Sequence, residues 1–133
     1  MLLGSPRASA CSCETVGSGE PDYRGQLQFA DAVFQGTVRE VRELESLPLK
    51  LVVFDADAAW KGVKASRVLI FTGWGGGDCG FDFEVGKRYF VWAKRNEWQA
   101  PGELATGTCS PTAPLESASM QLTQLGKPKQ LKQ

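Results

Sequence analysis

The residues of this chain best suited to chemistry are its four cysteines. Cys11 and Cys13 are separated by one residue, whereas Cys79 and Cys109 lie far away in the sequence. A disulfide between Cys11 and Cys13 would close a ring with one intervening residue, which forces strained geometry. We therefore expect each of the two to reach a distant partner, one to Cys79 and one to Cys109. Residues i and i+2 of an extended segment face the same way, so both thiols can enter one side of the fold.

The residues before Cys11 indicate export. Ala8, Ser9 and Ala10 form the Ala-x-Ala pattern that a signal peptidase cleaves. We interpret residues 1–10 as a truncated signal peptide or leader and predict a secreted or cell-surface protein, where disulfides persist. Cleavage there would give Cys11 a free α-amine on a chain end held by a disulfide, which suggests that the terminus has a function.

Two other uses of the cysteines are open. A four-cysteine zinc site usually pairs its ligands as CxxC, but the tight pair here is CxC. In a bacterial lipoprotein Cys11 would carry lipid, although Ala8 stands where a leucine is usual, and one other cysteine would stay unpaired. We favour two disulfides over both alternatives.

The composition argues against several functional classes. The 133 residues suit one domain, and Lys plus Arg equal Asp plus Glu at 15 each, so no overall field favours nucleic acid. The chain contains no histidine, which removes Ser-His-Asp and Cys-His catalysis and ordinary catalytic zinc sites. No apolar run has the length of a membrane span. We predict a monomeric protein without cofactor, enzymatic activity or nucleic-acid partner.

Alternating apolar residues predict a mainly β fold. Strands are expected over residues 32–42, 50–60, 67–72, 88–94 and 104–106. The pattern of the second strand puts these residues on one face: Val52, Phe54, Ala56, Ala58 and Trp60. A short helix is expected over residues 22–29, and Pro114 is expected to open another that ends at Gly126. Five short strands with flanking helices favour a small β-barrel, with a sandwich as the alternative.

The same patterns predict the core and the domain limits. The expected core residues are Phe34, Val38, Val52, Phe54, Val68, Ile70, Tyr89 and Val91. Leu115 and Leu122 are expected to pack on the outside of the barrel. The domain is expected to span residues 11–126, and residues 127–133 form a basic tail that we expect to be flexible.

An ordered set of motifs resembles the netrin-like domain, the module of the tissue inhibitors of metalloproteinases. The blocks that match are Cys11-Ser12-Cys13, residues 29–38, Trp60-Lys61-Gly62, Cys79-Gly80-Phe81, residues 86–93, residues 106–112 and Pro114-Leu115. They run from Cys11 to about Gly126. The resemblance implies a five-stranded OB-fold barrel flanked by helices. It also implies the pairing Cys11–Cys79 and Cys13–Cys109.

The resemblance further implies a protease-binding ridge. In the inhibitors, the α-amine and carbonyl oxygen of the N-terminal cysteine bind the zinc of the protease, and the next side chain enters its specificity pocket. By position, Cys11 would be the zinc ligand and Ser12 the pocket residue. The neighbours that would extend or support them are Cys13, Glu14, Thr15, Gly77, Asp78 and Cys79. We add Trp74, an aromatic residue among glycines, for which burial against the barrel is the alternative.

A second function is open because the resemblance covers more than inhibitors. The chain lacks the third disulfide that the vertebrate inhibitors carry in this domain. Many netrin-like domains are binding modules of extracellular proteins. The alternative to inhibition is therefore an extracellular or cell-surface protein-interaction module without inhibitory activity.

Overall fold

The computed structural model of the chain describes residues 11–13, 19–97 and 99–132. The expected leader, residues 1–10, lies outside the described residues, as do Glu14 and Thr15 of the expected ridge. In the described part, no helix is long and apolar enough to cross a membrane.

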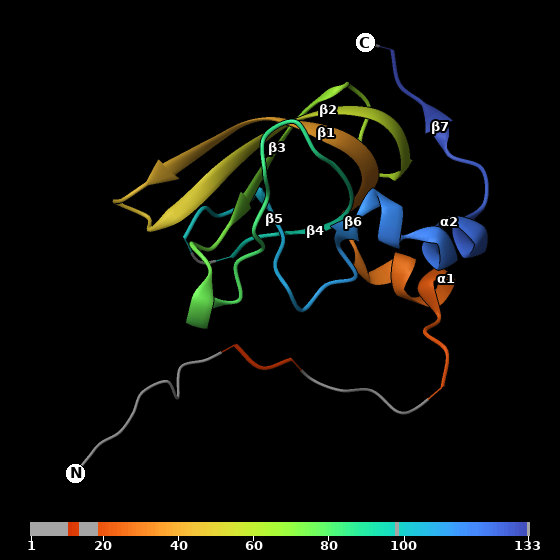
Figure 1. Ribbon diagram of the computed structural model, residues 1–133, viewed down its shortest axis with the longest axis horizontal. Coiled ribbons are helices and arrows are strands. Elements are labelled where there is room, and N and C mark those ends of the chain that lie inside the picture. The colour runs from red at the N-terminus through yellow and green to blue at the C-terminus, as the bar shows by residue number, and fades with distance from the viewer. Residues whose placement is uncertain (1–10, 14–18, 98, 133) are drawn as a thin grey trace.

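Five strands form a closed ring (Figure 1). They are β1 (Ala32–Leu44), β2 (Leu49–Lys61), β3 (Arg67–Thr72), β4 (Arg88–Arg95) and β5 (Leu104–Ala105). Strand β1 pairs antiparallel with both β2 and β4, and β2 pairs antiparallel with β3. Strand β5 closes the ring by pairing parallel with β3 and antiparallel with β4. The expected mainly β fold of five strands that close on themselves is confirmed.

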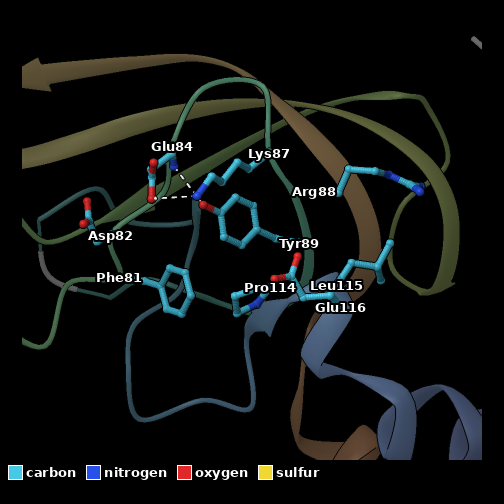
Figure 2. A pocket seen from close by; sticks show the side chains of 9 residues that line it. All are labelled: Phe81, Asp82, Glu84, Lys87, Arg88, Tyr89, Pro114, Leu115 and Glu116. Atoms are coloured by element: carbon cyan, nitrogen blue, oxygen red, sulfur yellow. Dashed lines mark hydrogen bonds and ion pairs between the residues drawn. The ribbon is translucent and has the colours of Figure 1, made fainter.

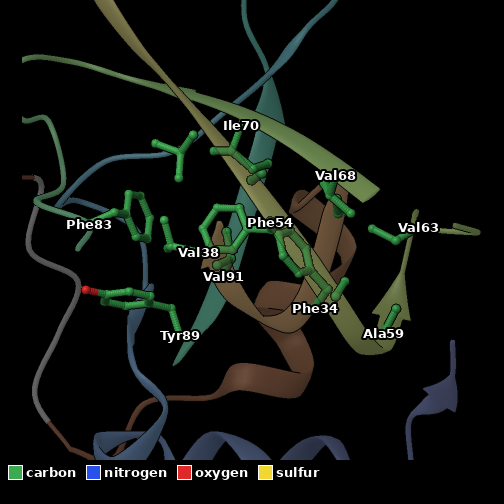
Figure 3. Close-up of a cluster of buried hydrophobic side chains, with 14 of the residues drawn as sticks. Phe34, Val38, Phe54, Ala59, Val63, Val68, Ile70, Phe83, Tyr89 and Val91 are labelled. Atoms are coloured by element: carbon green, nitrogen blue, oxygen red, sulfur yellow. The ribbon is translucent and has the colours of Figure 1, made fainter. Parts of the chain in front are cut away.

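The inside of the ring is filled by the predicted core. All eight residues expected there are at most 6% exposed. Three aromatic rings meet edge to face at its centre (Figure 3), with centroids 5.3 Å apart between Phe34 and Phe54 and 5.2 Å apart between Phe54 and Phe83. Period-2 alternation therefore predicted these eight inner residues correctly.

Short helices cover one outer side of the ring (Figure 1). They are α1 (Tyr23–Gln26) with a 3₁₀ turn (Leu27–Phe29), and α2 (Ser119–Leu125) after a second 3₁₀ turn (Leu115–Ser117). As predicted, Leu115 and Leu122 pack outside the ring, against a second apolar cluster that includes Phe90 and Trp92.

The expected single helix from Pro114 to Gly126 is wrong at its start. Residues Ala113–Pro114 form a short strand, β6, that pairs with Tyr89 and Phe90 of β4. Pro114 has an extended backbone, with φ −54° and ψ 142°, which its ring allows as readily as a helical one. Pro114 is therefore part of a strand paired with β4, and the α-helical turns begin only at Ser119.

A bulge in β2 makes the predicted face of that strand wrong at its end. Gln35 of β1 pairs with Ala58, but the next residue, Gly36, pairs with Ala56, so Asp57 is left out of the backbone pairing with β1. One extra residue reverses the alternation beyond it. Gly36 fits this place because a Cβ there would lie 2.7 Å from the backbone oxygen of Asp55.

The reversal moves Trp60 away from the inner face. Ala59 belongs to the core cluster inside the ring, in place of Ala58. Trp60 packs outside, with its ring centroid 4.8 Å from that of Phe90, and its indole N–H donates to the Gly126 carbonyl at 2.9 Å. This side chain therefore joins the sheet to the end of α2 (Ser119–Leu125) rather than filling the core.

The tail expected to be flexible over residues 127–133 is instead held against the sheet where the structure describes it. Strand β7 (Lys129–Gln130) pairs with Ala58 and Ala59 of β2. Leu131 is 8% exposed and contributes to the inner core. Its N–H donates to the carbonyl oxygen of Asp57 at 3.0 Å. The bulge residue, whose backbone is not paired with β1, thus provides one of the hydrogen bonds that anchor this segment.

Candidate functional site

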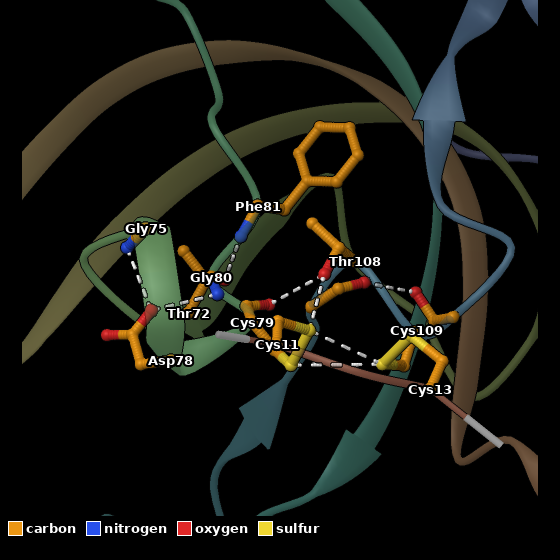
Figure 4. Close-up of a disulfide and its surroundings, with 12 residues drawn as sticks. Cys11, Cys13, Thr72, Gly75, Asp78, Cys79, Gly80, Phe81, Thr108 and Cys109 are labelled. Atoms are coloured by element: carbon orange, nitrogen blue, oxygen red, sulfur yellow. Dashed lines mark hydrogen bonds between the residues drawn. A yellow bond between two sulfur atoms is a disulfide. The ribbon is translucent and has the colours of Figure 1, made fainter. Parts of the chain in front are cut away.

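Two disulfides tie the segment Cys11–Cys13 to the body of the protein (Figure 4). Cys11 is bonded to Cys79 and Cys13 to Cys109, with Cα atoms 4.9 and 5.3 Å apart. The pairing implied by the resemblance is thus confirmed. No cysteine of the chain is free, so none is a thiolate that could hold zinc.

The first loop at this site is organised by the carboxylate of Asp78. Its Oδ2 accepts the N–H of Trp74 at 2.8 Å, and its Oδ1 accepts those of Gly75 at 2.9 Å and Gly80 at 3.0 Å. Desolvation is the largest single influence and acts to raise the pKa of this carboxyl, but these backbone donors together with the N–H of Asp78 itself outweigh it and hold the pKa below its ordinary range. The ionised carboxylate therefore closes the loop on itself.

Cys79 follows Asp78 in a left-handed backbone conformation, with φ 64°. A residue other than glycine rarely adopts this conformation unless its surroundings impose it. Here the neighbouring Gly80 packs so closely on Gly73 that a Cβ would collide with the Gly73 carbonyl oxygen. The disulfide partner of Cys11 is therefore presented by a tightly closed loop.

The second loop lies against the first. The N–H of Thr108 donates to the carbonyl oxygen of Cys79 at 2.8 Å, and the Thr108 hydroxyl lies 3.3 Å from the sulfur of Cys11. A Cβ on Gly107 would lie 2.5 Å from the same carbonyl of Cys79. The two cysteine-bearing loops are thus in direct backbone contact next to the segment Cys11–Cys13 (Figure 4).

A cluster of hydroxyl groups anchors this second loop to β4. The hydroxyl of Thr106 donates to the carbonyl oxygen of Trp92 at 2.6 Å and lies 2.9 Å from that of Thr112. The hydroxyl of Ser110 donates to the Gly107 carbonyl at 2.8 Å. We did not predict this support. The signal was present, because Ser and Thr alternate with other residues on both sides of Cys109.

The structure brings most of the predicted ridge residues to one site. Ser12 and Cys13 are exposed, as are Gly77 and Asp78 in the neighbouring loop. Cys11 and Cys79 are half-buried. Trp74 is 41% exposed, which favours the contact role over burial against the ring.

A groove that we did not predict begins at Phe81, two residues after Cys79 (Figure 2). It has a volume of about 560 Å³, and its apolar lining includes Phe81, Tyr89 and Leu115. Of the charged residues around it, Asp82 and Glu116 have no ion pair within the described part of the chain. The groove depends on the pairing of β6 with β4, which the sequence patterns do not specify.

The basic residues of the groove are already paired. Lys87 Nζ lies 3.3 Å from Glu84 Oε2, and Arg88 Nη2 lies 2.7 Å from Asp57 Oδ2. The hydroxyl of Tyr89 accepts the N–H of Glu84 at 2.9 Å, which holds the turn before β4 (Arg88–Arg95) against the strand. The charge that the groove can offer a ligand is therefore negative.

The role of Asp78 leads to a prediction on stability. An Asp78→Asn variant is expected to be less stable than the wild type by about 1 kcal/mol at pH 7, because a carboxylate accepts charge-assisted hydrogen bonds but is exposed here. The pKa is lower in the folded protein than in the unfolded chain, so this contribution is present above the unfolded-chain value and is lost as pH falls through the folded value. Urea unfolding at pH 7 and at about pH 3 measures both effects.

Asp82→Asn is the matched control, since Asp82 has no ion pair within the described residues. It is expected to change the free energy of unfolding little at either pH. An Asp78→Asn variant as stable as Asp82→Asn at pH 7 would show that the carboxylate does not hold the loop.

Comparison of the chain with models of known protein families and with curated protein sequences finds no match. The resemblance to netrin-like domains therefore rests on the quoted motifs.

Proposed function

We propose that this chain is a secreted netrin-like binding domain that inhibits a zinc metalloproteinase through Cys11. The observation that carries the proposal is the fixation of the segment Cys11–Cys13 by two disulfides, with exposed Ser12 between them. Disulfides are typical of extracellular compartments, which supports export.

The chemistry requires Cys11 to be the first residue of the chain. Its α-amine, once deprotonated, and its carbonyl oxygen can form a five-membered chelate ring with a metal ion. An amide nitrogen at the same place has no lone pair available to the metal. The chelate would replace the water on the catalytic zinc of a protease, which normally fills the position left open by the three protein ligands.

The loops next to the segment support the proposal by holding it still. The bridge from Cys11 to Cys79 ends on a loop that Asp78 closes, and Thr108 fixes the backbone of Cys79. A ligand that is rigid before binding loses little conformational entropy when it binds. The exposed side chain of Trp74 extends the surface on the same loop.

The proposal predicts that inhibition depends on a single peptide bond. A form beginning at Cys11 is expected to inhibit at least one zinc endopeptidase, and a form beginning at Ala10 is expected to lose this inhibition by a factor of about a hundred or more, comparable to the removal of a metal ligand's support. Both forms are assayed against a panel of zinc endopeptidases. The form with Ala10 is the matched control because it retains all four cysteines.

Disulfide mapping of both forms verifies that they carry the same bridges. Equal inhibition by the two forms would contradict chelation by the Cys11 α-amine. Absence of inhibition by either form would favour the second function.

The second candidate function is a protein-interaction module without inhibitory activity. The groove beside Phe81 favours it, because its apolar lining is flanked by Asp82 and Glu116, whose charges are not neutralised by ion pairs within the described residues. Aromatic rings and carboxylates together suit a segment that carries an apolar and a basic side chain. The partner of this module would be a protein with such a segment.

A further inference from the structure

Three sulfur atoms from the two disulfides lie in contact at the site. The sulfur of Cys109 lies 3.7 Å from that of Cys11 and 3.8 Å from that of Cys79, although Cys109 is bonded to Cys13. The sulfurs of Cys11, Cys79 and Cys109 all lie within 4.8 Å of one another. One bridge thus places a sulfur atom against both sulfurs of the other (Figure 4).

The two bridges differ in their exposure to solvent. Cys13 and Cys109 are both exposed, whereas Cys11 and Cys79 are half-buried. Access is one determinant of the rate at which a thiolate attacks a disulfide. A reductant in solution should therefore open the bridge between Cys13 and Cys109 first.

We propose that the bridge Cys13–Cys109 is a site of thiol–disulfide exchange that releases the segment Cys11–Cys13 from the protein. An external dithiol reduces this bridge and is itself oxidised to a disulfide, leaving thiols on Cys13 and Cys109. The thiolate of Cys109 then attacks the sulfur of Cys79. A new bond forms between Cys79 and Cys109, the bond between Cys11 and Cys79 breaks, and Cys11 leaves as a thiolate that takes up a proton.

The product of this exchange fits the existing backbone. The loops of Cys79 and Cys109 are already joined by the hydrogen bond from Thr108 N–H to the Cys79 carbonyl. The new bridge spans 30 residues of sequence, whereas the bridge from Cys11 to Cys79 spans 68. The shorter loop costs less entropy to close. The fold would thus retain one disulfide while the segment with Cys11 has none.

The consequence for binding rests on the proposed function, but the exchange does not. If the segment Cys11–Cys13 binds a protease, its release removes the rigidity that supports binding, and a dithiol becomes a chemical signal that switches the site off. The experiment therefore measures disulfide connectivity rather than inhibition.

The test uses a variant in which the thiol of Cys109 has lost its disulfide partner without any reductant. Cys13→Ser leaves Cys109 without its partner while the bridge from Cys11 to Cys79 can form. The purified variant is incubated without reductant at mildly alkaline pH, alkylated and mapped by mass spectrometry. We expect the bridge Cys79–Cys109, with alkylated Cys11, in roughly a tenth or more of the molecules, because exchange conserves the number of disulfides and closes a shorter loop.

The matched control is Cys109→Ser, which also has one free thiol. Its thiol is on Cys13, whose sulfur is not part of the cluster of three, and we expect it to retain only the bridge Cys11–Cys79. A Cys13→Ser variant that contains only Cys11–Cys79 would overturn the proposal. Mapping of wild-type protein treated with less than one equivalent of dithiol is a second test, because this treatment too should yield the bridge Cys79–Cys109. If the dithiol opens the bridge Cys11–Cys79 before Cys13–Cys109, the proposal is equally overturned.

Discussion

Replacing all four cysteines by serine is expected to lower the midpoint of thermal unfolding by roughly 15 °C or more. The bridges join residues 68 and 96 positions apart. By the chain-entropy estimate, the first such link contributes about 4 kcal/mol to stability. The second adds less, because the first has already shortened the loop that it closes. A domain of this size has about 5–15 kcal/mol in total, so the variant should lose a large part of it.

The measurement is thermal unfolding followed by circular dichroism for the wild type and the variant, each with and without a reductant. The reductant should destabilise the wild type strongly and leave the variant unchanged, which makes the variant its own control. A variant that unfolds within a few degrees of the wild type would mean that the ring of strands carries the stability alone.

Much of the ring could be predicted because its strands obey a simple period. β3 (Arg67–Thr72) has the predicted bounds, and β1, β2 and β4 differ from the prediction only near their ends. Their inward residues alternate with outward ones, as a two-sided sheet requires, although in β4 both sets are buried because Phe90 and Trp92 belong to the outer apolar cluster. The expectation for β2 failed where a single residue interrupts this pattern, at the bulge of Asp57. A bulge depends on the register with a partner strand, which one sequence does not contain.

Part of the candidate site could likewise be predicted from the sequence, and part could not. The spacing of the cysteines predicted that the segment Cys11–Cys13 would be bonded to distant residues, because a bridge within the segment would be strained. The supports of the site were harder to foresee. The hydrogen bonds of Asp78 and the contact between Thr108 and Cys79 depend on how two loops meet in space. The groove likewise requires residues of β6 and β4 that are far apart in the sequence.

Phe54→Ala is expected to lower the free energy of unfolding by about 3–5 kcal/mol. Phe54 is fully buried at the centre of the ring, between the rings of Phe34 and Phe83. Its truncation removes apolar burial and leaves a cavity, which the surrounding strands can close only in part because each is paired on both sides. Urea unfolding of the oxidised protein measures the change.

Leu69→Ala on β3 is the matched control for Phe54→Ala. Leu69 is 45% exposed, so its truncation should lower the free energy of unfolding by less than about 1 kcal/mol. Both variants retain the two disulfides, so the difference between them isolates the packing inside the ring from the cross-links. Equal losses would contradict the central place of Phe54. A large loss from Phe54→Ala alone would show that the aromatic core holds together the sheet to which the chain end is bonded.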